Sequence, residues 1–224
     1  MKLYLHPASP NCVTVLMTAI HSGIALETEF VDLMQGANRE PGYLALNPNG
    51  RVPTLMDGEF ALWESSAIMQ YIAAMKPGNP LWPNDERVRA DIARWQFWAV
   101  CHWAPALQPF VWENLFKRLK GMGGPDAAAL VRAEENFHRW AAVLDGHLAA
   151  RDHLVGEALT LADISAAAYL MYAKPACVPL QDCPEIRRWF ASIEALPAWQ
   201  RALPDPRVME KLASGDEETR APAA

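Results

Sequence analysis

Proline, glycine and asparagine residues crowd into positions 77–84 and divide the chain into two parts with different apolar periodicities. Before this segment, short apolar or alternating runs are mixed with helical spacing, whereas after it apolar residues recur only at helical spacing. Breaker-rich segments of this kind are typical of linkers between domains. The sequence therefore predicts a first domain over residues 1–78 and a second domain over residues 85–224.

The first part predicts a small α/β layer. Residues 2–6 and 26–31 are expected to form strands, and the helical spacing between them is expected to supply a crossover. An Asp-Gly turn within residues 52–62 predicts a hairpin, and helical spacing over residues 68–75 follows it. Residues 35–50 contain two prolines and are interpreted mostly as loop. Two parallel strands with a crossover, then a hairpin and a packing helix, make one compact layer.

The second part predicts helices alone, so the expected fold class is α/β followed by all-α. Apolar residues from Val88 onward lie at helical spacing, a break follows at residues 121–125, and a long helix is expected over residues 126–150. Thr160 with Asp163 three residues later makes a capping box, which predicts another helix start. Shorter helices are expected over residues 184–196 and 197–203, and the charged tail from Asp205 is expected to fray.

Composition and charge exclude several classes of protein. The formal net charge of −6 argues against general nucleic-acid binding. No apolar run approaches the roughly 18 residues that cross a bilayer, and the N-terminal apolar stretch breaks at Pro7, too early for a signal peptide. The 4 cysteines and 6 histidines show no metal-ligand or redox spacing. We therefore expect a cytoplasmic protein with no metal site, no disulfide framework and no membrane partner.

Three short segments of the first part carry groups suited to chemistry, and the first is Ser9-Pro10-Asn11-Cys12, between a strand and a helix. Serine stands where a Cys-x-x-Cys motif would have its first cysteine, so two-thiol disulfide chemistry is not available. The Ser9 hydroxyl and the N–H groups of the helix start can instead hold the thiolate of an external thiol and lower its pKa. The alternative is a purely structural N-cap.

The second segment is Asn47-Pro48-Asn49-Gly50-Arg51-Val52-Pro53. A proline at a strand start lies at an edge or a bend, because it cannot donate to the sheet. With a cis bond before Pro53, the backbone N–H and C=O of Val52 would face outward and pair with an extended peptide. Arg51 would then reach a carboxylate of that peptide. The alternative is a plain turn before the hairpin.

The third segment, Glu64-Ser65-Ser66, opens the last helix of the first part. A helix start at Ser65 suits an anion such as a carboxylate, and Glu64 can take the ammonium group of the same amino-acid end. The alternative is again a helix cap. Each segment is ambiguous alone, but their order and spacing fit one small thiol peptide held at its sulfur, its backbone and its amino-acid end.

With these segments, the sequence resembles the bacterial glutathione transferases related to the theta, delta and phi groupings. The resemblance covers nearly the whole chain, and Val52-Pro53 followed at this separation by Glu64-Ser65 is a specific signature. It continues into Leu159-Thr160-Leu161-Ala162-Asp163-Ile164 of the second part. The resemblance implies a thioredoxin-like N-terminal domain and an all-helical C-terminal domain, with glutathione as co-substrate and no metal.

The resemblance also implies roles for individual residues. Ser9 matches the serine that activates the sulfur of glutathione, and Asn11 competes with it because some relatives use threonine or asparagine in this loop. Val52 matches the residue whose backbone pairs with the cysteinyl part of glutathione, ahead of a cis proline at Pro53. Another bacterial grouping uses a cysteine nearby, but Cys12 lies one turn too far along and is expected to be a buried, small apolar residue.

Further glutathione contacts follow from the same resemblance. Glu64 and Ser65 match the residues that hold the γ-glutamyl end. Arg51 stands where relatives carry lysine or glutamine, near the glycyl side. Asn49 and Gln35 lie in the same neighbourhood of the site.

A dense group of aromatic residues lies within residues 95–116. An apolar, aromatic-lined pocket beside the thiol would suit a hydrophobic electrophile. We expect His102, Trp103 and Phe110 to line that pocket. The alternative is that these side chains belong to the ordinary core of the helical domain.

The resulting hypothesis is an enzyme, a glutathione S-transferase that conjugates the glutathione thiolate to hydrophobic electrophiles in detoxification. The resemblance further implies a homodimer. Two alternatives stay open. One is glutathione-dependent disulfide reduction or peroxidase chemistry, and the other is a non-catalytic ligand carrier that kept the fold.

Overall fold

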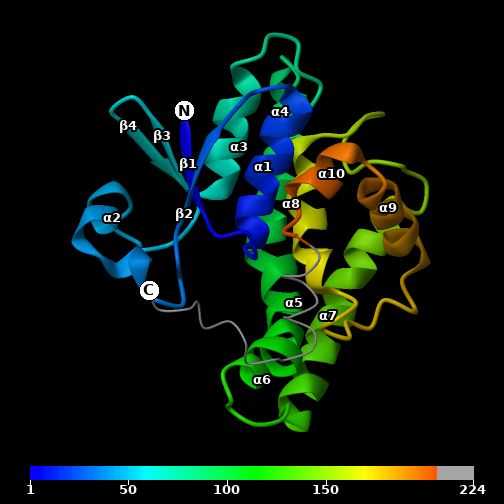
Figure 1. Cartoon of the computed structure of the whole chain (residues 1–224). Coiled ribbons are helices and arrows are strands. Elements are labelled where there is room, and N and C mark those ends of the chain that lie inside the picture. Colours follow the sequence, from blue (N-terminus) through cyan, green and yellow to red (C-terminus); the bar gives the residue numbers. More distant parts are fainter. Residues whose placement is uncertain (206–224) are drawn as a thin grey trace.

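The computed structural model describes residues 1–205, so the tail that was expected to fray lies outside the described residues apart from Asp205. A small β-sheet with its own helices lies beside a larger group of helices (Figure 1). The order of elements agrees with the α/β and all-α parts expected from the sequence.

One four-stranded sheet forms the centre of the first domain. Its strands are β1 (Lys2–Leu5), β2 (Glu27–Phe30), β3 (Thr54–Asp57) and β4 (Phe60–Trp63). Their order is β2-β1-β3-β4, with β2 parallel to β1 and the other pairs antiparallel. The parallel pair needs a crossover, which α1 (Pro10–Ser22) supplies as predicted. Leu3 and Leu55 are paired in register across β1 and β3 and are fully buried.

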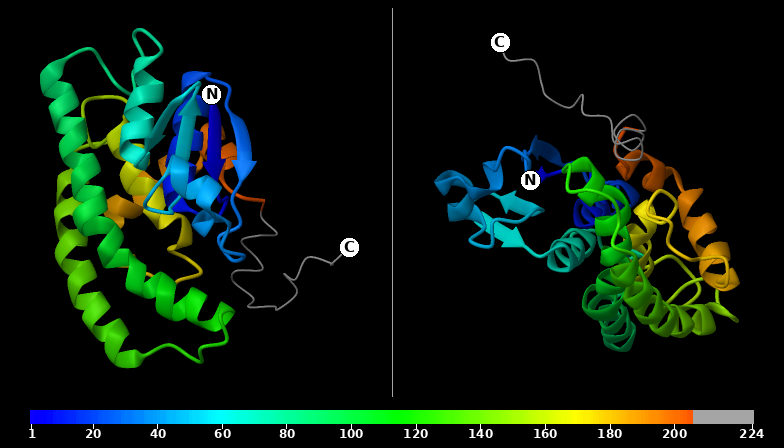
Figure 2. Two further views of the ribbon diagram at one scale, coloured as in Figure 1. Left: turned by 90° about the vertical axis from the view of Figure 1, so that its left-hand side faces the viewer. Right: turned by 90° about the horizontal axis from the view of Figure 1, so that it is seen from below.

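Helices cover both faces of this sheet (Figure 2). α1 packs against α3 (Ser65–Ala74) on one face, and the short helix α2 (Pro41–Leu46) lies on the other. Tyr4 of β1 meets Tyr43 of α2 edge-on, with ring centroids 6.0 Å apart.

The prediction that residues 35–50 are mostly loop was wrong. They contain the 3-10 turn η1 (Ala37–Arg39) as well as α2. Pro41 occupies the first turn of α2, where its missing N–H would have no helical partner in any case. Proline therefore starts this helix rather than breaking it.

A long helical stretch runs through residues 86–119 of the second domain. Its consecutive segments are α4 (Glu86–Trp98), η2 (Ala99–Trp103), α5 (Ala104–Val111), η3 (Trp112–Phe116) and α6 (Lys117–Leu119). Segments η2 and η3 are π-helical. Pro105 follows η2 and has no N–H to donate to the carbonyl of Cys101, which favours a wider turn at this point.

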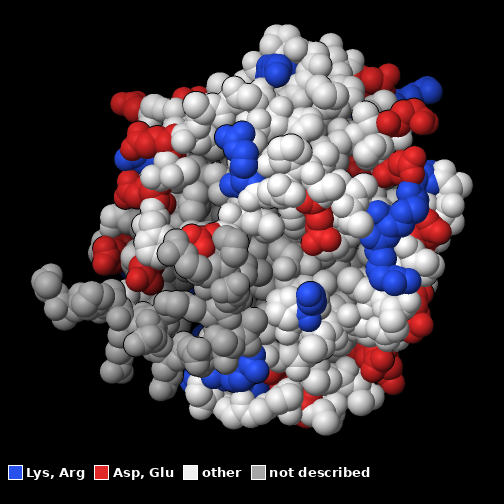
Figure 3. All heavy atoms as spheres, turned by 45° about the vertical axis from the view of Figure 1, so that its right-hand side comes forward, with Lys and Arg blue, Asp and Glu red and all other residues white. Residues whose placement is uncertain are grey.

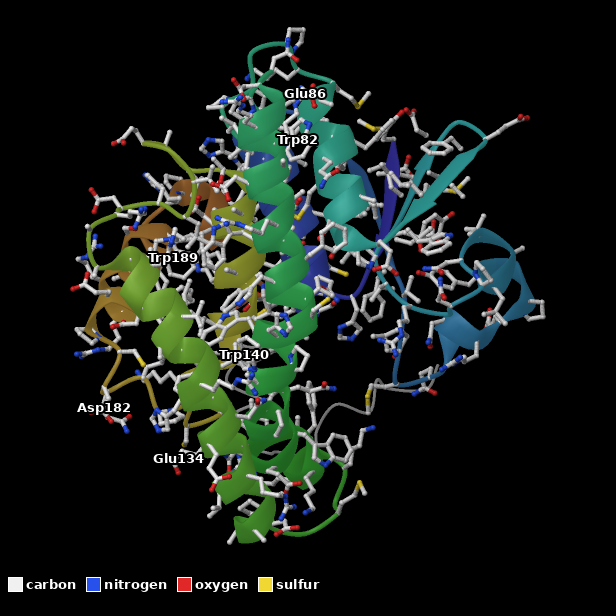
Figure 4. All side chains as sticks on the ribbon, turned by 180° about the vertical axis from the view of Figure 1, so that it is seen from behind. Trp82, Glu86, Glu134, Trp140, Asp182 and Trp189 are labelled. Atoms are coloured by element: carbon white, nitrogen blue, oxygen red, sulfur yellow. The ribbon has the colours of Figure 1, made fainter. Side chains whose placement is uncertain are left out.

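The remaining helices pack around this stretch. They are α7 (Ala127–Leu148), α8 (Leu161–Ala168), the 3-10 turn η4 (Tyr169–Tyr172), α9 (Pro184–Glu194) and α10 (Pro197–Ala202). α7 lies along α5 (Figure 4). Every residue of α8 is buried, and its small side chains let it pack closely on α1 and α4. The predicted capping box is confirmed, because the Thr160 N–H donates to Asp163 at 2.9 Å.

A buried polar contact joins the two domains. Gln70 of α3 donates to the Gln96 side-chain oxygen at 2.7 Å, and Gln96 donates to the Ser165 hydroxyl at 3.3 Å. Gln96 is only 1% exposed, so these bonds form out of water, where an unpaired amide would be costly. The contact fixes α3 against α4 and α8.

No helix within residues 1–205 is both long and apolar enough to span a membrane. On the face shown in Figure 3, Lys and Arg side chains are dispersed among Asp and Glu.

Candidate functional site

The start of α1 presents polar groups that do not cap the helix. Ser9 is the N-cap residue with extended backbone angles, yet its side chain makes no capping hydrogen bond. Pro10 has no N–H, and the Cys12 N–H bonds the Ser9 carbonyl at 2.9 Å. The Asn11 N–H has no partner within residues 1–205. A hydroxyl that makes no capping bond and a free N–H at a helix start make a site for a negatively charged group.

The loop that carries Ser9 is held from both domains. The His6 ring nitrogen Nδ1 accepts from the Ala8 N–H at 3.2 Å, and the Ser9 N–H donates to the His6 carbonyl at 3.0 Å. From the helical domain, the Tyr172 hydroxyl donates to the Ala8 carbonyl at 2.5 Å. These contacts fix the position of the Ser9 backbone before any ligand binds.

Asn11 lies where the two domains meet. Its side-chain oxygen accepts from the Tyr169 hydroxyl at 2.9 Å and from the Ser65 hydroxyl at 3.4 Å. Asn11 therefore connects the start of α1 to the start of α3 and to η4. The sequence pattern placed Asn11 near the sulfur but carried no signal for the two tyrosines, because they lie more than 150 residues further along the chain.

Cys12 is excluded as the reactive thiol by its surroundings. It is a free thiol that is fully buried in the core. Burial raises the pKa of this thiol to about 11, which the nearby backbone of His6 and the Ser9 hydroxyl only partly offset. The expectation that Cys12 is a buried, small apolar residue is confirmed.

The segment before β3 offers a free backbone edge. The Val52–Pro53 bond is cis, and neither the N–H nor the C=O of Val52 has a partner within residues 1–205. The Arg51 carbonyl accepts from the Tyr43 hydroxyl at 2.6 Å and from the Asn47 amide at 2.8 Å. Tyr43 and Asn47 thus hold this segment in place while the Val52 backbone stays available for an added strand.

Arg39 is a cation beside this segment that the sequence pattern did not single out. Gly50 has a φ of +57°, and a Cβ there would lie 3.0 Å from the Asn38 carbonyl and 3.2 Å from the Arg39 guanidinium. The Asn38 amide donates to the Gly50 carbonyl at 2.6 Å. Glycine is therefore required at this position, and Arg39 lies directly against the segment.

The other predicted residues of this neighbourhood lie at the surface. Gln35, Asn49 and Arg51 are all exposed. The Asn49 side chain is tied back to the Asn47 oxygen at 3.0 Å, and the Gln35 backbone donates to Asp32 at 3.1 Å.

The start of α3 completes the site. Ser65 is 9% exposed and carries the hydroxyl that contacts Asn11, while Glu64 is exposed and has no ion-pair partner within residues 1–205. Glu64 has φ +72° and ψ +113°, a backbone region that costs a residue with a Cβ about 1–3 kcal/mol. The N-cap position again lacks a side-chain capping bond. The helix start is thus left open to a ligand carboxylate.

The predicted acceptor-pocket residues lie among the aromatic side chains of the helical domain. Trp103 and Phe110 are buried against Phe137 of α7, with ring centroids 5.7 and 6.0 Å apart, and His102 stacks on Trp140 at 4.2 Å. Figure 4 shows Trp140 on the side of α7 that faces the α4–α5 helix. Helical spacing identified a group of aromatic residues in this stretch but did not predict which way each side chain points. The buried positions of Trp103 and Phe110 match the alternative of ordinary core packing. Another aromatic pair, Phe116 and Tyr172 with ring centroids 6.3 Å apart, is tied to the first loop because the Tyr172 hydroxyl donates to the Ala8 carbonyl.

No group of three or more His, Cys, Asp or Glu side chains among residues 1–205 is arranged to hold a metal ion. The groups that the structure does bring together are a hydroxyl, free backbone N–H and C=O groups, an amide and one carboxylate. Such a set binds a peptide with charged ends and can stabilise a thiolate by hydrogen bonding.

Comparison with known proteins agrees with this geometry. The family model "Glutathione S-transferase, N-terminal domain" matches residues 1–74, and "Glutathione S-transferase, C-terminal domain" matches residues 99–197. The chain is 36% identical to glutathione S-transferase 3 of Zea mays over 91% of this chain and 93% of that protein.

Solved structures show the same fold. Glutathione transferase F7 from Populus trichocarpa has a TM-score of 0.82 at 27% identity, covering 90% of this chain and 96% of its own. The theta class glutathione S-transferase of Xanthomonas axonopodis pv. citri, solved with glutathione bound, has a TM-score of 0.79 at 30% identity, covering 91% of this chain and 97% of its own.

A thioredoxin-like sheet with an open peptide edge between two uncapped helix starts, followed by a helical domain, defines a class of proteins that bind small thiol peptides. Within that class, this chain belongs to the glutathione S-transferase family.

Proposed function

We propose that the protein is a transferase that joins the thiolate of glutathione to an electrophilic carbon of a hydrophobic compound. The observation that carries the proposal is the unpaired Val52 backbone. The pairing of Tyr4, Thr54 and Trp63 puts Val52 at the same end of the sheet as the segments that lead to Ser9 and to the open helix start at Ser65. A tripeptide pairing with Val52 has its sulfur directed to Ser9 and its amino-acid head to Ser65.

In this proposal the charged groups at each end of glutathione lie next to protein groups of opposite charge or polarity. The γ-glutamyl carboxylate accepts from the N–H groups of the α3 start and from the Ser65 hydroxyl, which gives up its 3.4 Å contact with Asn11 to do so, and the γ-glutamyl ammonium pairs with Glu64. The glycyl carboxylate lies near Arg51 and Arg39, which flank the segment before β3. These contacts position the thiol but do not by themselves activate it.

The chemical step needs only a stabilised thiolate and a nearby acceptor. The Ser9 hydroxyl donates to the sulfur, and because this bond is stronger to a thiolate than to a thiol, it favours loss of the thiol proton to water. The sulfur lone pair then forms the new carbon–sulfur bond, and the leaving group departs with the electrons of its own bond. The acceptor lies against Phe116, a partly exposed ring that packs on the buried Tyr172 next to the Ala8 loop.

Two measurements test this function. Calorimetry should show that the purified protein binds glutathione, and a chloro-aromatic acceptor should be conjugated with release of chloride. A parallel assay with a mixed disulfide of glutathione measures disulfide reduction. Turnover confined to the mixed disulfide would replace the transferase proposal with the reductase alternative, and failure to bind glutathione would favour the non-catalytic carrier.

A homodimer is a further part of the proposal. Large apolar side chains are exposed on the edge strand β4 and on the α4–η2 stretch: Phe60 50%, Trp63 39%, Phe97 70% and Val100 43%. Exposed apolar area of this kind is typical of a surface that a second copy covers. Light scattering after size exclusion should give twice the chain mass, and a Phe97→Glu substitution should shift the mass to that of one chain. A single-chain mass for the unaltered protein at micromolar concentration would exclude the dimer.

The proposed setting is the cytosol and the proposed role is detoxification. All four cysteines are free thiols, which is the state expected in a reducing compartment that also holds reduced glutathione. Conjugation adds charged groups to an apolar electrophile and so makes it water-soluble. Fractionation of the source cells, followed by immunodetection, tests the location.

A further inference from the structure

The helical domain supplies a hydroxyl to the thiol site from far along the chain. Tyr169 opens η4, and its hydroxyl donates to the Asn11 side-chain oxygen at 2.9 Å. Within residues 1–205 this oxygen is the only hydrogen-bond acceptor of the Tyr169 hydroxyl. Asn11 lies two residues after Ser9, in the first turn of α1.

The Tyr169 hydroxyl is a donor in this contact rather than an acceptor. Burial, and secondly the negative charge of Glu64, raise the pKa of Tyr169 to about 12, so the hydroxyl keeps its proton near neutral pH. A buried hydroxyl proton needs an acceptor, and an amide oxygen is one whereas an amide nitrogen is not. The contact therefore fixes which of the two amide atoms of Asn11 faces Tyr169.

The other amide atom of Asn11 is left free. Oδ1 is occupied by Tyr169 and by the weaker contact from Ser65, and Nδ2 has no partner within residues 1–205. Because a carboxamide is planar with oxygen and nitrogen on opposite sides, Nδ2 faces away from Tyr169. Asn11 is partly exposed, so a ligand lying over the start of α1 can reach this nitrogen.

We propose that Tyr169 is a positioning residue, which turns the Asn11 amide so that its Nδ2–H group donates to the glutathione sulfur alongside Ser9. This inference rests on the proposed glutathione transferase function. In it Asn11 touches the reacting sulfur, whereas Tyr169 acts only through Asn11. Ser9 and Asn11 are then no longer alternatives for the thiol stabiliser, because both donate a hydrogen bond to the same sulfur.

Tyr172 of the same 3-10 turn provides an internal comparison. Its hydroxyl donates to the backbone carbonyl of Ala8 and so holds the loop without orienting a donor side chain. Tyr169 and Tyr172 are three residues apart, which in a 3-10 turn places both on one face. Both hydroxyls are removed by the same small change to phenylalanine, so they form a matched pair of variants.

The decisive experiment is a double-mutant cycle between Tyr169→Phe and Asn11→Ala in the full-length protein. The readouts are the pKa of bound glutathione, followed by ultraviolet absorbance of its thiolate, and the pH dependence of the conjugation rate. Tyr169→Phe should raise the thiol pKa and lower kcat about three- to tenfold, with little change in KM for glutathione. In the Asn11→Ala background, Tyr169→Phe should have no further effect.

The controls separate orientation from general packing. Tyr172→Phe should change the rate by the same factor in both backgrounds, because it does not act through Asn11. Asn11→Asp keeps the oxygen that Tyr169 contacts and loses the Nδ2 donor, and it should also raise the thiol pKa. A Tyr169→Phe effect of equal size with and without Asn11, or an unchanged thiol pKa in Tyr169→Phe, would overturn the inference. Failure of the unaltered protein to bind glutathione would instead overturn the proposed function.

Discussion

Two helix starts in this molecule have the same type of N-cap residue, but only one of them is capped. Ser9 begins α1 and Thr160 begins α8, and both are hydroxyl residues in the N-cap position with extended backbone angles. The Thr160 hydroxyl accepts from the Ala162 N–H, and its backbone N–H is bonded by Asp163. The Ser9 hydroxyl makes no capping bond. A preferred capping residue therefore serves the fold at one helix and is left free at the other.

The same contrast holds at other helix starts. Asp85 and Asp126 cap α4 and α7, each accepting from two backbone N–H groups. Glu64, at the start of α3, makes no such bond and has a positive φ. The two helix starts that face the glutathione site are thus uncapped, whereas these helix starts of the helical domain are capped. Unsatisfied N–H groups at a helix start cost stability unless a ligand takes them up, so these two starts suit the binding of a ligand.

The largest effect is expected at the capped start of α8. Asp163 is fully buried and accepts from the Leu154 N–H at 2.8 Å, the Thr160 N–H at 2.9 Å and the Trp189 indole at 3.0 Å. Asp163→Ala leaves these donors buried without a partner. The free energy of unfolding should fall on the order of 3–5 kcal/mol, measured by urea denaturation.

The conservative variant Asp163→Asn sharpens this test. It keeps one acceptor oxygen and the side-chain volume, so its loss of stability should be smaller than that of Asp163→Ala. For both variants, kcat of the fraction that remains folded should be close to that of the unaltered protein. A stable Asp163→Ala protein with low kcat would mean that this helix start serves catalysis, and the contrast with Ser9 would fail.

The next largest effect is expected at the uncapped start of α1 and should fall on rate instead of stability. Ser9→Ala removes the donor to the thiolate, so kcat for conjugation should drop at least about tenfold while glutathione still binds. Because Ser9 makes no capping bond, the melting temperature should change little.

Asp126→Ala is the matched variant for Ser9→Ala, since it removes a side-chain cap that is in use. The N–H groups of Ala129 and Ala128 lower the pKa of Asp126, so its contribution is present above the unfolded pKa and is lost as pH falls through the folded pKa. At neutral pH, Asp126→Ala should lower the melting temperature and leave kcat unchanged. Wild-type turnover in Ser9→Ala would remove Ser9 from the mechanism.

Much of this contrast was visible in the sequence because its signals are local. The thiol-site serine, the Val52-Pro53 pair and the Thr160 capping box each depend on residues a few positions apart, and all three lie where the pattern placed them. The order of strands and helices in the first domain followed from periodicity and turn residues for the same reason. The misjudged Pro41 segment shows the limit of such signals, because proline both starts and ends helices.

Contacts between distant segments could not be predicted in this way. Tyr169 and Tyr172 reach the first loop only because α8 packs on α1, which no local pattern records. His102 and Trp103 face α7 because η2 is π-helical, and the wider turns shift each side chain from its α-helical direction. A spacing rule based on the α-helix cannot assign these directions.

The smallest predicted effect tests whether the strain at the start of α3 is kept for binding. Glu64 occupies a positive-φ region that strains a residue with a Cβ, so Glu64→Gly, which has no Cβ, relieves about 1–3 kcal/mol of strain and adds about 0.5–1 kcal/mol of unfolded-chain entropy cost. The net change should be a stabilisation between about zero and 2 kcal/mol, seen as a higher midpoint in urea. KM for glutathione should rise because the partner of its ammonium group is lost, while kcat at saturation stays close to the original.

Glu64→Gln, which keeps the side chain at this φ and removes the charge, should raise KM without the gain in stability. If Glu64→Gly lowers stability and leaves KM unchanged, the open start of α3 belongs to the fold rather than to the site, and the comparison with Thr160 no longer separates the two.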